Sequence, residues 1–468
     1  MTLKSTYLIT YILSFMSLFI FQISGLNILS YYFFIGLFFL LIKPKFTLNT
    51  ICKLIASKPT KYLFFFIIWL IFGIIISVYT MKFDFRGFLM SFLGGLVLSI
   101  ILPLLMQIIA IPRICKIKKI IQVTTLIFLS IFTLGIVEFV IYSLDLSPLT
   151  YVWKTLLQKR TPYSLGFPRV SSVFGEPSFL GFFIIVTCPI IYYISKSKSI
   201  LFSNPVTDKL VKRLVFIFMV FNLFLTQSPI YILMGLVLSI FFLRDWIFRF
   251  KLKTVFICIN IVILLSLTFL PRYLLAINES FDINKTVLKR VKAVVENVSD
   301  FRLLVIAEPS LSSRIINCVT NISIFMKNPI IGVGYGNLNP EMLKEFESLS
   351  IPLTPELAEK IYSPDAPSGG NGTAIFFRLL AETGIIGTFL FYMFLFSLLR
   401  LIQLKIKDFF GIERDFLIGL KYFIILLIIN SVYTSHPHWT YLWLLLGIAQ
   451  AMILTRVNKP LNNNQVES

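Results

Sequence analysis

Residues 374–399 read AIFFRLLAETGIIGTFLFYMFLFSLL, and this stretch decides which kind of fold the chain can adopt. It is apolar apart from Arg378 and Glu382, which are spaced four positions apart and could pair on one helical face. The stretch is longer than the ~20 residues that an α-helix needs to cross the hydrocarbon core of a membrane. Comparable apolar runs recur along the whole chain, so we predict an all-α polytopic membrane protein.

The composition supports this prediction. Of the 468 residues, 57% are hydrophobic and only 14% are charged, and 49 are Phe. No soluble core could absorb so much apolar surface. Hydropathy over windows of about 19 residues predicts about twelve membrane helices, and the first is expected to be retained because it lacks a signal-peptide cleavage pattern. The expected helices lie near residues 6–24, 26–42, 62–80, 87–111, 120–144, 177–195, 214–226, 228–243, 254–270, 374–399, 416–433 and 440–456.

The net charge of +21 could suggest nucleic acid, but in a polytopic protein the positive-inside rule explains it, and we expect no nucleic-acid partner. Lys and Arg cluster in alternate short connections, which we predict to be cytoplasmic together with both termini. The chain then divides into helices one to nine (1–270), one large extracytoplasmic loop (271–373), and helices ten to twelve with a cytoplasmic tail (374–468).

The large loop has an internal order of its own. Apolar spacing predicts helices near 284–301 and 312–326. The passage NPIIGVGYGNLNP (328–340) follows, where Gly332, Gly334 and Gly336 allow close approach of the backbone. The Pro-rich tail from 352 to 372 is expected to be irregular and to act as a mobile lid.

Two segments could bind phosphate. In FPRVSSVFGEPSFLG (167–181), the Arg169 guanidinium has donors suited to phosphate oxygens, and the Glu176 carboxylate could accept a proton from a hydroxyl. The alternative is that the two side chains pair with each other. The second segment contains Arg314 and the glycine-rich turn of Gly334 and Tyr335. Arg314 is either a surface residue or a second phosphate ligand, and the backbone amides of the turn could face the same anion.

Other polar residues are less specific. Arg378 and Glu382 form either a structural or a functional pair, and Asn371 lies in the SGGNG passage just before them. His436, in SHPHW, gives only a weak metal signal, so we predict no metal site. Three further charged residues of the helices, Glu138, Asp415 and Lys421, could serve ion transport but are more consistent with structural roles. The chain has no Walker-type P-loop and we expect no cofactor.

Three motifs together resemble the O-antigen polymerase and O-antigen ligase superfamily of bacterial envelope enzymes. They are RVSSVFGEPSFLG, then SSRIINCVTNISIFMKNPIIGVGYGN, then FFRLLAETGIIG after a long outer loop. The resemblance implies a GT-C-like, metal-independent, inverting glycosyltransferase of the bacterial inner membrane. Its donor and acceptor would be undecaprenyl-diphosphate-linked oligosaccharides, joined at the periplasmic face, and a chain-length regulator protein is a possible partner.

The resemblance also implies that Arg169 and Arg314, at the family's arginine positions, contact the donor diphosphate. Gly334, Tyr335, Asn371, Arg378 and His436 are the candidate substrate-binding residues. The usual His base of the family is absent here, so Glu176 is the candidate base by elimination. Ligases usually carry a His-Asn pair just before the LLAETG-like helix, where this chain has Thr373 and Ala374. We therefore favour an O-antigen polymerase over a ligase that transfers polymer to the lipid A core. If the protein is not an enzyme, the alternative is a lipid-linked oligosaccharide flippase or other transporter.

Overall fold

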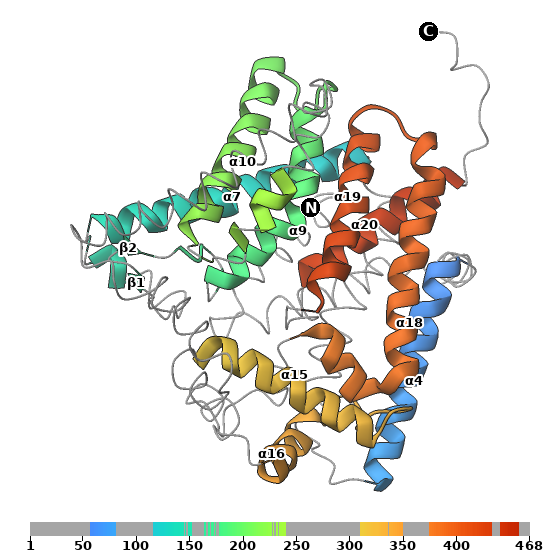
Figure 1. Cartoon of the computed structure of the whole chain (residues 1–468). Helices are drawn as coiled ribbons and strands as arrows, with labels where there is room; N and C mark the ends of the chain where they lie inside the picture. Colours follow the sequence, from blue (N-terminus) through green and yellow to red (C-terminus); the bar gives the residue numbers. More distant parts are fainter. Residues whose placement is uncertain are drawn as a thin grey trace, which may run out of the picture. The chain divides into compact units, whose positions relative to one another are not determined.

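The computed structural model describes a largely helical chain (Figure 1). The described residues are 57–80, 116–144, 177–226, 309–335, 337–349, 374–432 and 440–457, with short stretches at 146, 148–151, 163–164, 167–168, 170–172, 174, 228, 231–232 and 234–239. They form two compact units, one of Met1–Ser130, Val186–Phe216 and Pro309–Ser468, the other of Ile131–Ile185 and Ile217–Glu308. Each unit is described by itself below.

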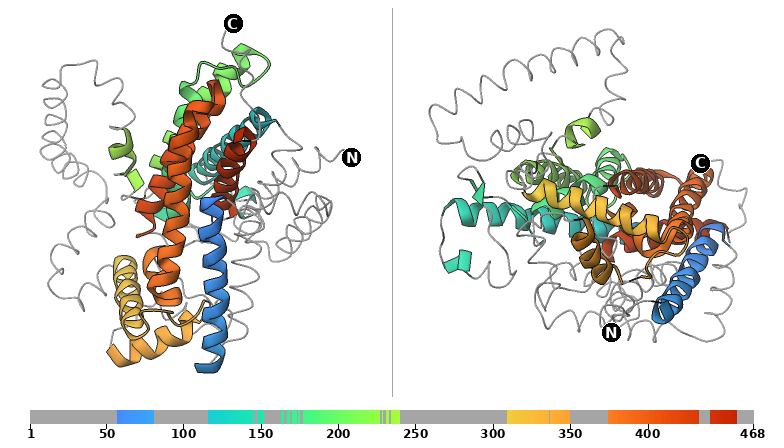
Figure 2. Two further views of the ribbon diagram at one scale, coloured as in Figure 1. Left: turned by 90° about the vertical axis from the view of Figure 1, so that its right-hand side faces the viewer. Right: turned by 60° about the horizontal axis from the view of Figure 1, so that its bottom comes forward.

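The first unit is organised around α18 (Ile375–Lys405), whose long apolar run packs along α4 (Lys58–Thr80). The two helices are antiparallel, because Phe66 of α4 contacts Phe391 with ring centroids 5.6 Å apart, whereas Trp69 bonds the Thr383 carbonyl. Figure 2 shows them side by side. The helices α19 (Gly411–Asn430) and α20 (Thr440–Val457) also pack on α18, where the Trp443 ring stacks on Phe394.

Two helices of the large loop lie at the N-terminal end of α18. They are α15 (Pro309–Lys327) and α16 (Leu338–Leu349), which pack on each other, and α15 also packs on α18. The turn that joins them contacts α18 around Gly384 and lies against Gly73 near the end of α4. The described part of the large loop is thus attached to one end of the α4–α18 pair.

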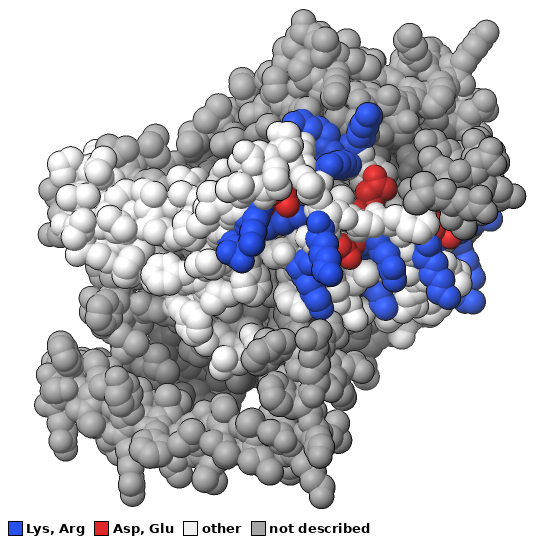
Figure 3. Space-filling model, turned by 90° about the horizontal axis from the view of Figure 1, so that it is seen from above, with Lys and Arg blue, Asp and Glu red and all other residues white. Residues whose placement is uncertain are grey.

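The opposite end of α18 belongs to a basic face, seen from above in Figure 3. On this face, exposed cations gather at the start of α7 (Ile117–Ser143), between α9 (Pro177–Lys196) and the first turns of α10 (Pro205–Leu225), and between α18 and α19. They are Lys116, Lys118, Lys119, Lys196, Lys198, Lys209, Arg213, Arg400, Lys407 and Arg414. Three of the predicted basic connections therefore meet on one face of this unit.

The second unit contains the remaining parts of α7, α9 and α10 and a short antiparallel hairpin of β1 (Tyr163–Ser164) and β2 (Phe167–Pro168). The Phe183 ring lies between Phe132 and Phe174, with centroids 6.2 and 5.2 Å away. The Asn222 amide donates to the Phe132 carbonyl at 2.8 Å, so a polar side chain joins two apolar helices.

Several sequence predictions are confirmed. Helices are found where they were expected near 62–80, 120–144, 177–195, 374–399, 416–433, 440–456 and 312–326. Four of the described helices are long and apolar enough to cross a membrane, namely Lys58–Ile76, Ile117–Ser143, Pro177–Lys196 and Ile375–Asp408. The helices expected near 6–24, 26–42, 87–111 and 254–270 fall outside the described residues, so the total of twelve stays a prediction.

Two predictions need correction. The helix expected at 214–226 begins already at Pro205, because Pro is favoured in the first helical turn and a hydropathy window cannot detect polar turns. The turn-rich passage at 328–340 ends earlier than expected, because Leu338 begins α16, a short amphipathic helix that the hydropathy pattern did not reveal. The all-α prediction is confirmed, because the described residues are helical apart from connecting turns and one strand pair of two residues each.

Candidate functional site

The second and third motifs form one hydrogen-bonded structure in the first unit. Helix α18 is broken at Gly384, whose φ of 65° and ψ of −170° are not helical. Just before the break, the Ala381 carbonyl accepts a hydrogen bond from the Val333 amide at 2.9 Å, and the Glu382 carbonyl accepts one from the Gly334 amide at 3.0 Å. The glycine-rich turn therefore docks on the interrupted helix through its backbone.

The break leaves polar backbone groups inside an apolar span, and neighbouring segments satisfy them. The Thr383 carbonyl accepts a hydrogen bond from the Trp69 indole at 2.9 Å. The Ile385 amide, whose helical partner would be four residues earlier, instead donates to the Pro329 carbonyl at 2.8 Å. Because an unsatisfied backbone group in a membrane costs several kcal/mol, these contacts permit the break.

Glycine is required on both sides of this contact. A Cβ at Gly384 would lie 2.1 Å from the Ile330 carbonyl oxygen, and a Cβ at Gly332 would lie 2.6 Å from the Glu382 carbonyl oxygen. Both glycines also have positive φ, 65° and 74°. We name this contact of residues 328–335 with residues 381–385 the glycine clasp.

A charged pair lies beside the glycine clasp. The Arg378 guanidinium bonds the Glu382 carboxylate at 3.1 Å, and both side chains are almost fully buried. Arg378 Nε and Glu382 Oε2 have no hydrogen-bond partner among the described residues, so each retains capacity for a polar ligand.

Tyr335 of the glycine-rich turn is close enough to both charges to respond to them. Burial raises the pKa of the Tyr335 hydroxyl, the Arg378 charge lowers it and the Glu382 charge raises it. The net pKa is well above its ordinary value, so the hydroxyl stays protonated and can donate a hydrogen bond. The structure thus brings together three of the predicted substrate-binding residues, Gly334, Tyr335 and Arg378.

Arg314 lies in the second turn of α15, one turn before Asn317 and two before Asn321 along the same helical register. Asn317 and Asn321 are both buried. Neither amide atom of Asn321 has a hydrogen-bond partner in the described part of the chain. A carboxamide can both donate to and accept from a sugar hydroxyl, so this part of α15 carries polar groups suited to a glycan.

Helix α15 is held by a polar link to α16. Lys327 forms an ion pair with the buried Glu345 carboxylate, which also accepts a hydrogen bond from Ser323. Burial raises the pKa of Glu345, but the bonds from Lys327 and Ser323 outweigh it, and the pKa lies below its ordinary value. The link fixes the helix that carries Arg314 relative to its neighbour.

The first motif is held by a buried carboxylate in the second unit. Glu138 of α7 accepts hydrogen bonds from the Ser171 and Ser172 amides, at 3.0 and 2.5 Å, and from the Ser171 hydroxyl at 3.3 Å. The Val170 amide donates to the Leu225 carbonyl at 3.0 Å. The residues that directly follow Arg169 are therefore fixed to two helices, a role for Glu138 that the sequence did not reveal. The available signal was a lone Glu in an apolar helix.

Several predicted site residues fall outside the described residues. These are Arg169, Glu176, Asn371 and His436, and the 352–372 segment expected to be a lid. Their placement, and the proximity of Arg169 to Arg314, remain predictions. Within the described ranges, no group of three or more His, Cys, Asp or Glu could hold a metal ion.

The fold and these contacts define a helical membrane protein with a polar, backbone-clasped region at one end of its longest helix. Residues 214–392 match a protein-family model described as O-antigen ligase. The match includes Arg314, the glycine clasp and Arg378, and it ends before His436 and begins after Arg169. It supports the O-antigen polymerase and ligase superfamily and an activity in lipopolysaccharide assembly, and does not separate polymerase from ligase. No curated protein matches the chain.

Proposed function

We propose that the protein is an O-antigen polymerase of the bacterial inner membrane. It joins oligosaccharide repeat units carried on undecaprenyl diphosphate, at the periplasmic face, and is a metal-independent, inverting glycosyltransferase with a GT-C-like fold. The observation that carries the proposal is the glycine clasp, which unites the second and third motifs of the superfamily inside the region of the family match.

The proposed reaction needs few groups. The acceptor hydroxyl oxygen attacks the anomeric carbon of the donor glycan, the bond from that carbon to the diphosphate oxygen breaks, and undecaprenyl diphosphate leaves. Arg169 and Arg314 stabilise the negative charge that develops on the diphosphate, as guanidiniums do by paired donors. Glu176 orients the acceptor hydroxyl and takes its proton.

The described contacts assign supporting roles. Glu138 positions the backbone after Arg169, and the α15–α16 link positions the helix of Arg314. Tyr335 and Arg378, beside the glycine clasp, are proposed to contact the glycan or its diphosphate, as are Asn371 and His436. The basic face at the other end of α18 agrees with a cytoplasmic side there, so that the described part of the large loop is periplasmic.

Alanine substitution at Arg169 or Arg314 tests the proposal. Each variant should leave glycolipid with a single repeat and abolish long chains, at normal protein abundance. Arg400→Ala is the matched control, because Arg400 is an exposed residue near the far end of α18 and should retain the full ladder of chain lengths. A normal ladder from both test variants would refute the assignment.

The description of the matching family favours a ligase as the second candidate. A ligase would transfer finished polymer to the lipid A core. Deletion of the gene separates the two functions, because loss of a polymerase leaves one repeat attached to the core, whereas loss of a ligase leaves bare core and polymer on its carrier. Substrate trapped on the cytoplasmic leaflet would instead indicate a flippase. Co-purification tests the proposed chain-length regulator.

A further inference from the structure

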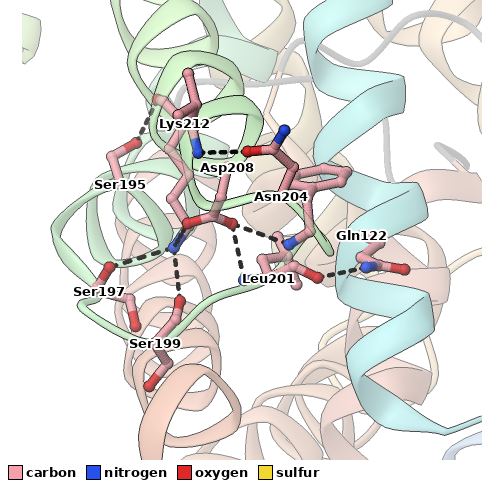
Figure 4. Close-up of polar contacts among 10 residues, drawn as sticks. Gln122, Ser195, Ser197, Ser199, Leu201, Asn204, Asp208 and Lys212 are labelled. Atoms are coloured by element: carbon pink, nitrogen blue, oxygen red, sulfur yellow. Dashed lines mark hydrogen bonds and ion pairs between the residues drawn. The ribbon is translucent and has the colours of Figure 1, made fainter.

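The loop after α9 is fixed by a buried ion pair, drawn in Figure 4. Lys212 of α10 bonds Asp208 at 2.8 Å and donates to the Ser197 and Ser199 carbonyls at 3.2 and 2.7 Å. Asp208 in turn accepts from the Leu201 amide at 2.7 Å. The loop is therefore held in one conformation before any ligand binds.

This rigid loop forms one wall of a cavity of about 370 Å³ in the first unit. The other walls come from the last turn of α9 and the start of α19. The lining residues are Tyr193, Lys196, Ser197, Lys198, Ser199 and Asp415. Lys196 and Lys198 of its lining belong to the basic face, and Asp415 follows the end of α18 that is opposite the glycine clasp.

Polar groups around the cavity are available to a ligand. Ser197 is nine-tenths buried, and its hydroxyl has no hydrogen-bond partner among the described residues. Figure 4 shows this side chain directed away from Lys212, whose contact with Ser197 is to the backbone carbonyl and not to the hydroxyl. Within the described part of the chain, neither Lys198 nor Asp415 forms an ion pair. A buried hydroxyl without a partner costs free energy, which a bound oxygen atom would offset.

The depth of the cavity points to a lipid. The apolar span Pro177–Lys196 ends at the cavity, so its lysines lie where the hydrocarbon core gives way to the headgroups. Tyr193 stacks on Tyr422 of α19, with ring centroids 5.8 Å apart, and tyrosines of this kind are typical of the membrane interface.

The charges select the kind of headgroup. Two ammonium groups and a hydroxyl suit the oxygens of a phosphodiester, and the many exposed cations of this face favour a ligand with net negative charge. Asp415 would repel a second anionic group, but its carboxylate can accept hydrogen bonds from alcohol hydroxyls. A phosphodiester that bears a diol satisfies both demands.

We propose that this cavity binds the headgroup of phosphatidylglycerol, with the phosphate between Lys196 and Lys198 and the glycerol hydroxyls on Asp415. The Ser197 hydroxyl donates to a phosphate oxygen. The site is independent of the proposed transferase activity, and it ties the α9–α10 loop to the start of α19 on the basic side of the membrane.

Native mass spectrometry of the purified protein in detergent tests the site, with phosphatidylglycerol, phosphatidylmethanol and phosphatidylethanolamine of equal chain length as probes. The protein should retain phosphatidylglycerol best, and Lys196→Gln/Lys198→Gln should weaken retention by roughly 10- to 30-fold. The control Lys209→Gln/Lys407→Gln removes the same charge from the same face outside the cavity and should bind normally.

Two further variants keep the test decisive. Asp415→Ala should bind phosphatidylglycerol and phosphatidylmethanol equally, since it removes the carboxylate that accepts hydrogen bonds from the diol. Ser197→Ala should weaken retention of both lipids, and it serves as the test of the site if the double lysine variant does not fold. Equal loss in the pocket and control variants would show diffuse charge attraction and overturn the site. Equal binding of soluble glycerol 3-phosphate and of the lipid would overturn the assignment to a membrane lipid.

Discussion

Two glycine substitutions in the first unit should change stability in opposite directions. Gly384→Ala places a Cβ 2.1 Å from the Ile330 carbonyl oxygen, at a φ of 65° that other residues rarely adopt. Gly73→Ala, in α4, places its Cβ at an ordinary 3.7 Å from Ile331 Cγ2, inside a regular helix. Both substitutions add one methyl group next to residues 330 and 331 of the same turn.

The magnitude follows from what each methyl group displaces. At Gly384 the backbone conformation costs about 1–3 kcal/mol for a residue with a side chain. The clash also separates the backbone hydrogen bonds of the glycine clasp, each worth about 0.5–1.5 kcal/mol. We expect Gly384→Ala to lower the free energy of unfolding by roughly 3–6 kcal/mol. Gly73→Ala should raise it by roughly 0.5–1 kcal/mol, because Ala loses less backbone entropy in a helix.

Thermal unfolding of the purified variants in detergent measures both effects. Gly384→Ala should melt well below the wild-type protein, and Gly73→Ala at or slightly above it. If the glycine clasp also shapes the transferase site, Gly384→Ala should shorten the glycan ladder at a temperature where it is still folded. Wild-type stability of Gly384→Ala would refute the clasp, and equal destabilisation by Gly73→Ala would show that the region tolerates no added volume.

Three further predictions concern buried charges. Glu138→Ala leaves two amides and a hydroxyl without an acceptor and should lower the free energy of unfolding by roughly 3–5 kcal/mol. Glu138→Gln keeps an acceptor oxygen and should cost less. Thermal unfolding in detergent compares the stability of the two variants. Arg378→Leu should cost roughly 3–5 kcal/mol because it leaves Glu382 charged and buried, and Arg378→Leu/Glu382→Leu should recover much of the loss in the same assay; a double variant less stable than the single one would contradict this. The pKa of Glu345 is lower in the folded protein than in the unfolded chain, so the stability that the Lys327–Glu345 ion pair contributes is fully present above about pH 4.5 and is lost as pH falls through the folded pKa. In a series of melting curves at decreasing pH, the melting temperature should fall more steeply for the wild type than for Lys327→Met. Parallel falls would exclude a stabilising role for this ion pair.

The sequence was sufficient for features that depend on local composition. Apolar length placed α4, α7, α9 and α18 within a few residues, because a membrane helix satisfies its own backbone and needs only apolar side chains. The alternation of Lys and Arg predicted one basic face, and the described connections do gather on one. Apolar length did not predict the polar first turns of α10, which begins at Pro205, before the expected start at 214.

The candidate site depended more on contacts between distant residues. The sequence identified Arg378, Tyr335 and the glycines as candidate substrate-binding residues in two motifs, but not that backbone hydrogen bonds join the two motifs. Glu138 could be noticed only as an isolated carboxylate, since its partners are backbone amides more than 30 residues away, which no spacing rule connects. Asp415 likewise became interesting only beside Lys196 and Lys198.

By itself, then, the sequence determined a helical membrane protein and the motifs that resemble O-antigen assembly enzymes, and it predicted which connections are cytoplasmic. Only the tertiary structure decided that α18 is interrupted at Gly384 and that the glycine-rich turn fills the gap. The physical reason is that a helix break in an apolar span is stable only when another segment supplies the missing hydrogen bonds. The partners at Pro329, Val333 and Gly334 lie some 50 residues away in the chain and meet α18 only in the folded protein.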